Sequence, residues 1–173
     1  MEWGTYNIVG LGETTAEQSF DNNGDAGLSD FDGSGPRLRI IAQPSGSLMF
    51  ASDTNNDGTS NSTFGLRRVV SEGLLGTWLS TTTENDLLMI VLFDDGAYFH
   101  GEVDEDDDTE ISGMELGAYA HDESTGLLTV TQTFDNNGGT GLTDYVGIGA
   151  PNIFVDVEGD ILTANVNEDG DQL

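Results

Sequence analysis

The sequence predicts an all-β fold, an antiparallel meander that closes into a small barrel or folds into a sandwich. Three observations lead to this prediction. Short runs of apolar residues alternate with polar ones, which is the periodicity of β-strands. The chain contains 24 glycines, many of them beside Asn, Asp or Ser in turn-like segments. Finally, the sequence repeats itself at long range, which indicates a duplicated unit.

The repeat is clearest in the segment Phe-Asp-Asn-Asn-Gly at residues 20–24, which returns at residues 134–138. Downstream, Gly-Leu-Ser-Asp at 27–30 returns as Gly-Leu-Thr-Asp at 141–144. Upstream, Met1-Glu2 returns as Met114-Glu115, an offset of 113 residues. A single one-residue gap aligns the two copies, so we expect a duplicated unit of about 113 residues.

The repeat divides the chain into two segments that hold different parts of the unit. Residues 1–73 match the second half of a unit and its closing strand, so we expect a partial β repeat there. Residues 74–173 match a first half and a second half without that closing strand, which predicts the second β repeat. Either residues 64–70 close the barrel that begins at Trp78, as in a circular permutant, or a neighbouring chain completes the open edges.

In the first segment, polar alternation predicts five strands separated by turns. Leu38 and Ile40 would share one face of the third strand, and Leu48 and Phe50 one face of the fourth. The polar residues 13–16 are expected to form a turn. The five strands are expected at residues 1–6, in a segment ending at 20, at 37–43, at 47–52 and at 64–70.

In the second segment, the most apolar strand is expected at residues 87–93. Asp94-Asp95-Gly96 would turn it into a hairpin. In the strand 127–135 we expect Phe134 to face inward, together with Leu128 and Val130. The remaining strands are expected near 75–78 and at 97–103, 111–121, 152–158 and 161–167, whereas 104–110 would be an acidic hairpin tip.

The second segment has its motifs in a characteristic order, which is Gly-Thr-Trp at 76–78, Asp-Gly-Ala-Tyr at 95–98 and Gly-Met-Glu-x-Gly-x-Tyr at 113–119, and the first segment adds Phe-x-Leu-x-Arg-Val at 64–69. This order resembles the tandem lipocalin-like (calycin) β-barrel repeats of secreted and surface bacterial proteins. The resemblance implies small barrels and an extracellular or cell-surface location. In such barrels an arginine of the last strand commonly covers the Gly-x-Trp strand, which implies that Arg68 stacks on Trp78.

The chain is strongly acidic. It has 32 Asp and Glu residues against four arginines, and its formal charge is -28. Such a surface repels nucleic acid and anionic lipid, so we expect no nucleic-acid binding and no membrane insertion. It favours divalent cations or a saline medium, which leaves halophilic or marine adaptation and specific cation binding as alternatives. The longest apolar run, 87–93, is too short to cross a bilayer, so we expect a soluble mature form or an excised piece.

Oxygen-rich loops suggest calcium. Asp53, Asn55 and Asp57 alternate and precede a glycine, as in the opening of a calcium loop, although Phe64 at the twelfth position excludes an EF-hand. The alternative is an ordinary polar turn. The matching segment of the second copy supplies the further candidate ligands Asn165, Asn167, Asp169 and Asp171. The Asp-Asn-Asn-Gly segments supply Asp21, Asn23 and Asp135.

Catalytic signals are weak. The chain has no cysteine, and neither His100 nor His121 lies in a nucleophile or metal-ligand motif. We therefore expect a non-enzymatic structural or adhesive module with calcium as a stiffener. It would self-associate through residues 1–60 by strand-edge pairing, into a filament if the exchange does not close. The alternative is a lipocalin-like carrier that holds a small apolar ligand in a barrel.

Overall fold

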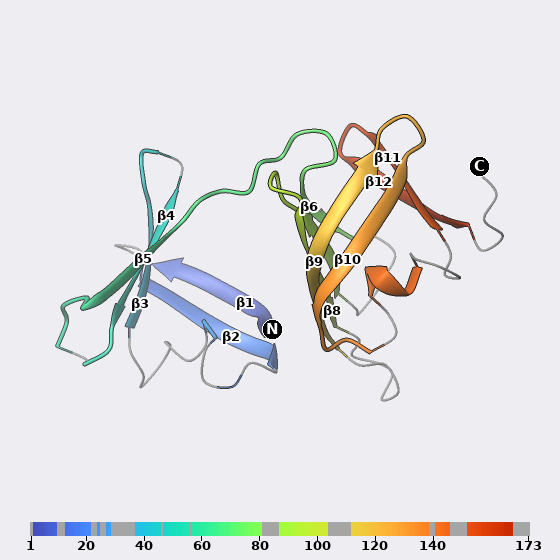
Figure 1. The fold of residues 1–173 in the computed structure, drawn as a ribbon. Helices are drawn as coiled ribbons and strands as arrows, with labels where there is room; N and C mark the ends of the chain where they lie inside the picture. Colours follow the sequence, from blue (N-terminus) through green and yellow to red (C-terminus); the bar gives the residue numbers. More distant parts are fainter. Residues whose placement is uncertain are drawn as a thin grey trace. The chain divides into compact units, whose positions relative to one another are not determined.

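The computed structural model describes residues 2–9, 13–21, 24, 27–28, 37–45, 47–55, 57–80, 87–103, 112–138, 141–145 and 152–167. Within these residues the fold is all-β, as predicted, with twelve strands in two antiparallel sheets and no α-helix (Figure 1). The chain divides into two compact units, 1–68 and 69–173. No helix among the described residues is long and apolar enough to span a bilayer.

The first unit is a five-stranded meander in which each strand pairs with the next, in the order β1-β2-β3-β4-β5. Its strands are β1 (Glu2–Val9), β2 (Glu13–Asp21), β3 (Arg37–Ala42), β4 (Leu48–Asp53) and β5 (Ser62–Leu66). Leu38 and Phe50 are the buried apolar side chains on one face of this sheet. The ring of Phe64 in β5 stacks on that of Phe50 with the centroids 5.1 Å apart. The hydrophobic core of this unit is therefore small.

The second unit is a seven-stranded meander that curls into a nearly closed barrel. Its strands are β6 (Gly76–Leu79), β7 (Leu87–Leu92), β8 (Ala97–Val103), β9 (Gly113–Asp122), β10 (Leu127–Asp135), β11 (Asn152–Glu158) and β12 (Ile161–Asn167). A short 3₁₀ helix, η2 (Leu142–Tyr145), follows β10. Consecutive strands joined by tight turns at Gly96, Gly126 and Gly159, all with positive φ, produce this order.

The core of the second unit lies inside the barrel. Inward side chains of β7, β8, β10 and β11 pack with Leu142 of η2, so the interior is occupied by protein. Each large side chain buried there contributes about 1.5–3 kcal/mol relative to exposure. The buried residues are Leu92, Tyr98, Leu128, Leu142, Ile153 and Val155.

Three sequence expectations are wrong in detail. Residues 13–16 are the first residues of β2 and do not form a turn, because Thr14 is buried opposite Leu38 of β3. The last strand of the first unit stops at Leu66, and 67–70 are not strand. Phe134 is 44% exposed, because a bulge between Gln132 and Phe134 moves it to the other face of the sheet.

Candidate functional site

The two units share one local arrangement around a glutamate. Glu2 lies opposite Asp21 in the first sheet, and Glu115 lies opposite Asp135 in the second. In each unit a bulge follows immediately along the strand pair. Positions of the two sheets can therefore be matched, with Glu2 in the place of Glu115.

In the second unit, the Glu115 carboxylate is fully buried and faces two hydrogen-bond donors. The Tyr98 hydroxyl donates to Oε1, and the Thr143 N–H lies 3.3 Å from both carboxylate oxygens. A Cβ atom at Gly141 would overlap this carboxylate, so a larger residue there would have to displace it. Burial, followed by the hydrogen bond to Glu115, raises the pKa of Tyr98 above its usual value. Glu115 thus holds the segment after β10 against the barrel.

In the first unit, Glu2 has the matching role. Its carboxylate accepts the Leu28 N–H, and a Cβ atom at Gly27 would overlap it. Among the described strands, β1 pairs only with β2, so no strand stands where β8 brings Tyr98 to Glu115. Within the described residues, the first unit therefore has an open edge at the place where the second unit has β8.

That open edge borders an apolar hollow of about 480 Å³. Trp3 is 40% exposed, Tyr6 70% and Phe64 56%, although they line it. In the second unit the matching surface is covered, because Tyr98 is 1% exposed and lies against Gly117 of β9. The remaining lining residues are Glu2, Gly4, Thr5, Ala16, Glu17, Gly27, Leu28, Leu38, Phe50 and Ser52.

The seven-stranded sheet also leaves two edges open. Its order runs from β12 to β6, and within the described residues neither strand has a second partner. A groove of about 530 Å³ lies along these edges, between β12 on one side and β6 and β7 on the other. Leu79 and Ile161, which border it, are 59% and 67% exposed. The other lining residues are Trp78, Ser80, Leu88, Ile90, Asp160, Leu162, Thr163 and Ala164.

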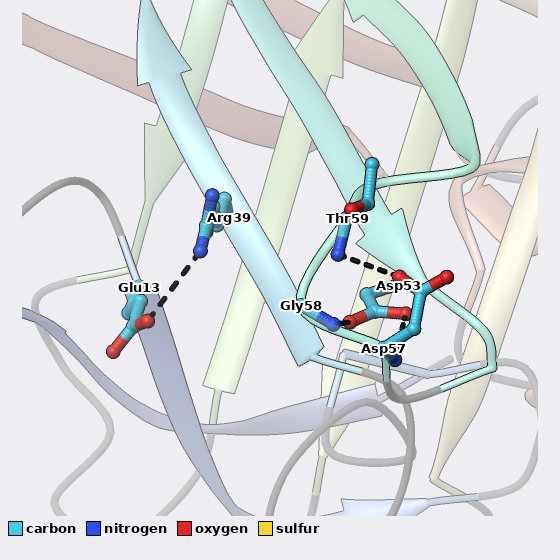
Figure 2. Close-up of polar contacts among 6 residues, drawn as sticks. All are labelled: Glu13, Arg39, Asp53, Asp57, Gly58 and Thr59. Carbon is cyan, nitrogen blue, oxygen red and sulfur yellow. Dashed lines mark hydrogen bonds and ion pairs between the residues drawn. The ribbon is translucent and has the colours of Figure 1, made fainter.

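The Asp53 loop is a turn whose polar groups bond to one another. Asp53 is 3% exposed, and its carboxylate accepts the Asp57 N–H at 3.2 Å and the Gly58 N–H at 2.6 Å. Asp57 also accepts the Thr59 N–H at 2.8 Å (Figure 2). The Asn55 amide donates to Asp57 at 3.1 Å. The structure therefore brings the three predicted ligands together, in a hydrogen-bonding pattern that an ordinary polar turn also has.

The other candidate ligands are scattered. Asp21 and Asp135 end β2 and β10, and Asp135 accepts the Asn137 N–H at 2.8 Å. Asn165 lies within β12 and is exposed, so it is a strand residue and not part of a loop, while Asn167 is the last residue of that strand. Within the described residues no three His, Asp or Glu side chains gather as a metal group. Asn23, Asp169 and Asp171 lie outside the described residues.

The histidines occupy different surroundings. His100 is 2% exposed, and its Nδ1 lies 3.2 Å from the Asn137 amide nitrogen. Burial lowers the pKa of His100 to about 4, while the charge of Asp135 opposes this, so the ring is neutral at pH 7. Among the described residues, the buried Nε2 atom of His121 has no hydrogen-bond partner. It lies beside a cavity of about 450 Å³ that Glu123 and Val155 also line.

Arginine makes one ion pair between the described strands of the first sheet. Arg39 lies 3.7 Å from Glu13 across β2 and β3 (Figure 2). Such a partly exposed pair contributes about 0–1 kcal/mol. Arg68 is exposed beyond the end of β5, and the Trp78 indole donates to the Leu74 carbonyl at 2.9 Å. Since Arg68 and Trp78 belong to different units, their stacking stays a prediction.

The sequence analysis did not predict the sites where Glu2 lies against Gly27 and Glu115 lies against Gly141, which we call the carboxylate cradles. The signal was present, because Met-Glu and Gly-Leu recur together in both copies of the repeat. A glutamate and a glycine that recur together indicate a carboxylate that needs space where a Cβ atom would stand. Comparison with known proteins adds no further constraint, since no protein family, no curated protein and no solved structure matches this chain.

Proposed function

We propose that the protein is a non-enzymatic β-repeat module of the extracellular space or cell surface, with a structural or adhesive role. Copies of the module associate where strand edges are open. The observation that carries this proposal is the apolar hollow of the first unit, in which Trp3, Tyr6 and Phe64 are exposed. The matching place in the second unit is covered by a strand.

Physical chemistry supports association at such a surface. A contiguous apolar patch exposed beside an unpaired strand is a template for another chain, which adds main-chain hydrogen bonds and buries the patch. Interiors filled by side chains suit a scaffold better than a carrier, and the barrel interior here is filled. The two matched carboxylate cradles further support a duplicated unit.

A small-ligand carrier is the second candidate. The hollow of about 480 Å³ is large enough for a small apolar molecule and is lined mainly by apolar and aromatic side chains. Calcium and salt have a supporting role in either function, because screening lowers the repulsion among the charges that sum to -28.

Light scattering over a wide range of protein concentration tests the proposal. The expected result is a mass that rises with concentration, in sodium chloride or calcium. Replacing Trp3 and Tyr6 by serine should reduce association, whereas the control Phe134→Ser, at an exposed aromatic of the other sheet, should not. A protein that stays monomeric throughout, yet binds a neutral apolar dye one to one in the hollow, would favour the carrier.

A further inference from the structure

The groove along β6 and β12 has the shape of a missing strand, and the first unit shows which strand. The repeat matches Thr14 of β2 with Leu128 of β10. Leu38 of β3 lies opposite Thr14, and Ile153 of β11 lies opposite Leu128, so Leu38 and Ile153 occupy matching positions. From there, Ser52 of β4 matches Val166 of β12, because they lie opposite Leu38 and Ile153 respectively. β4 and β12 are therefore counterparts.

Their outer edges differ. β4 is paired with β5, so that Ser62 lies opposite Ser52 and Phe64 opposite Phe50. Within the described residues, β12 has β11 as its single partner. The inward residues of β12 become exposed as a result, since Ala164 is open to solvent and Val166 is 42% exposed.

We propose that β5 of a second copy of this chain fills the groove between β12 and β6. This inference rests on the proposed function and adds β5 and the groove between β12 and β6 to the open edges through which copies associate. By the register of the first unit, Ser62 of one copy lies opposite Val166 of the other, Phe64 opposite Ala164, and Leu66 opposite Leu162.

The exchange is favourable because β5 gains a second neighbour. In its own unit β5 is an edge strand with all five residues exposed. Between β12 and β6 it would keep an equivalent of its pairing with β4 and add pairing along β6. The small side chain of Ala164 leaves room for the Phe64 ring, which would enter a groove lined by Trp78 and Leu162.

The segment that follows β5 supports the same placement. Arg67 and Arg68 come directly after Leu66, and Asp160 lies on the groove. An arginine next to a tryptophan face or a carboxylate adds an attractive contact in a chain that otherwise repels its own copies. Each copy would donate one strand and accept one, so the contact is head-to-tail and extends into rings or filaments.

Cysteine cross-linking tests this placement, because the chain has no native cysteine. A Ser62→Cys chain is mixed with a separately tagged Val166→Cys chain in sodium chloride and oxidised. The expected product is a covalent pair of the two variants, with the disulfide located by mass spectrometry. Asn165→Cys is the matched control, because its side chain points to the opposite face of β12, and with it the product should be lost.

Three results would overturn the inference. The first is that the 62–166 cross-link forms only within one chain that carries both cysteines, which would mean that β5 closes its own barrel. The second is efficient cross-linking of Ser62→Cys to Ser52→Cys without any 62–166 product in samples that light scattering shows to be associated. In that case association stands and the strand exchange is wrong. The third is a monomer throughout, which contradicts both proposals.

Discussion

The Phe64 ring lies stacked on the Phe50 ring with an interplanar angle of 18°, although Phe64 is 56% exposed and Phe50 only 7%. One exposed aromatic on an edge strand therefore covers a buried one. The stack joins β5 to β4. The first unit would lose this contact if β5 left its sheet to pair with another copy.

Replacing Phe64 by alanine should destabilise the first unit by about 1–3 kcal/mol, through lost stacking and uncovering of Phe50. Thr63→Ala, on the other face of the same strand, is the control and should change little. Urea unfolding followed by Trp3 fluorescence in a Trp78→Phe background measures the first unit alone. Equal effects of the two substitutions would contradict the role of the stack.

Gly141→Ala should destabilise the second unit by about 1–3 kcal/mol or more, because its Cβ atom would overlap the buried Glu115 carboxylate. Gly65→Ala is the matched control, since a Cβ atom there would lie 3.9 Å from its nearest neighbour. Thermal unfolding followed by circular dichroism provides the comparison. A melting temperature of the Gly141→Ala protein equal to that of the control would mean that the cradle yields easily.

His100 should make the second unit less stable as pH falls. Its pKa is about 4 in the folded chain and 6.5 as the ordinary value, so the unfolded chain takes up a proton first. The contribution of neutral His100 to the free energy of unfolding is fully present above about pH 6.5. It falls by about 3 kcal/mol between there and about pH 4, at about 1.36 kcal/mol per pH unit.

The His100→Asn protein isolates this effect. Protonation of the carboxylates also changes stability with pH, but it does so in both proteins and cancels in their difference. The gap in unfolding free energy between wild type and variant should therefore narrow from pH 7 to pH 4. A gap that is independent of pH would show that His100 titrates normally.

Salt should raise the melting temperature, because the Debye length falls from about 10 Å at about 0.1 M to about 3 Å at about 1 M. Calcium should raise it further at equal ionic strength if the Asp53 loop binds the ion. Asp57→Asn would then remove the extra increase. Asp122→Asn, which removes the same charge from another turn, would keep it. Identical effects of calcium and sodium at equal ionic strength would favour halophilic adaptation.

Strand positions followed well from the sequence where alternation and turn residues agree. The hairpin 152–158 and 161–167 was predicted at its observed bounds, because Glu-Gly-Asp separates two alternating runs. Phe134 was misplaced because a bulge does not change the residue pattern. The Glu115 cradle joins β8, β9 and η2, and alternation within one strand carries no information about such a contact.

The Asp53 loop shows a different limit of sequence reasoning. The sequence identifies which oxygen atoms are near one another, and the structure shows Asp53 engaged by two backbone N–H groups. Alternating Asp and Asn before a glycine favour both a turn and a cation loop, because both need the same tight backbone. Only a binding measurement separates the two.

The most direct test of the account is hydrogen exchange of backbone amides as a function of protein concentration, since association through open edges must protect edge strands. We expect the amides of β1, β5, β6 and β12 to exchange more slowly as concentration rises, while those of the interior strands β9 and β10 do not change. Edge-strand exchange rates that are the same from dilute to concentrated solution would contradict it.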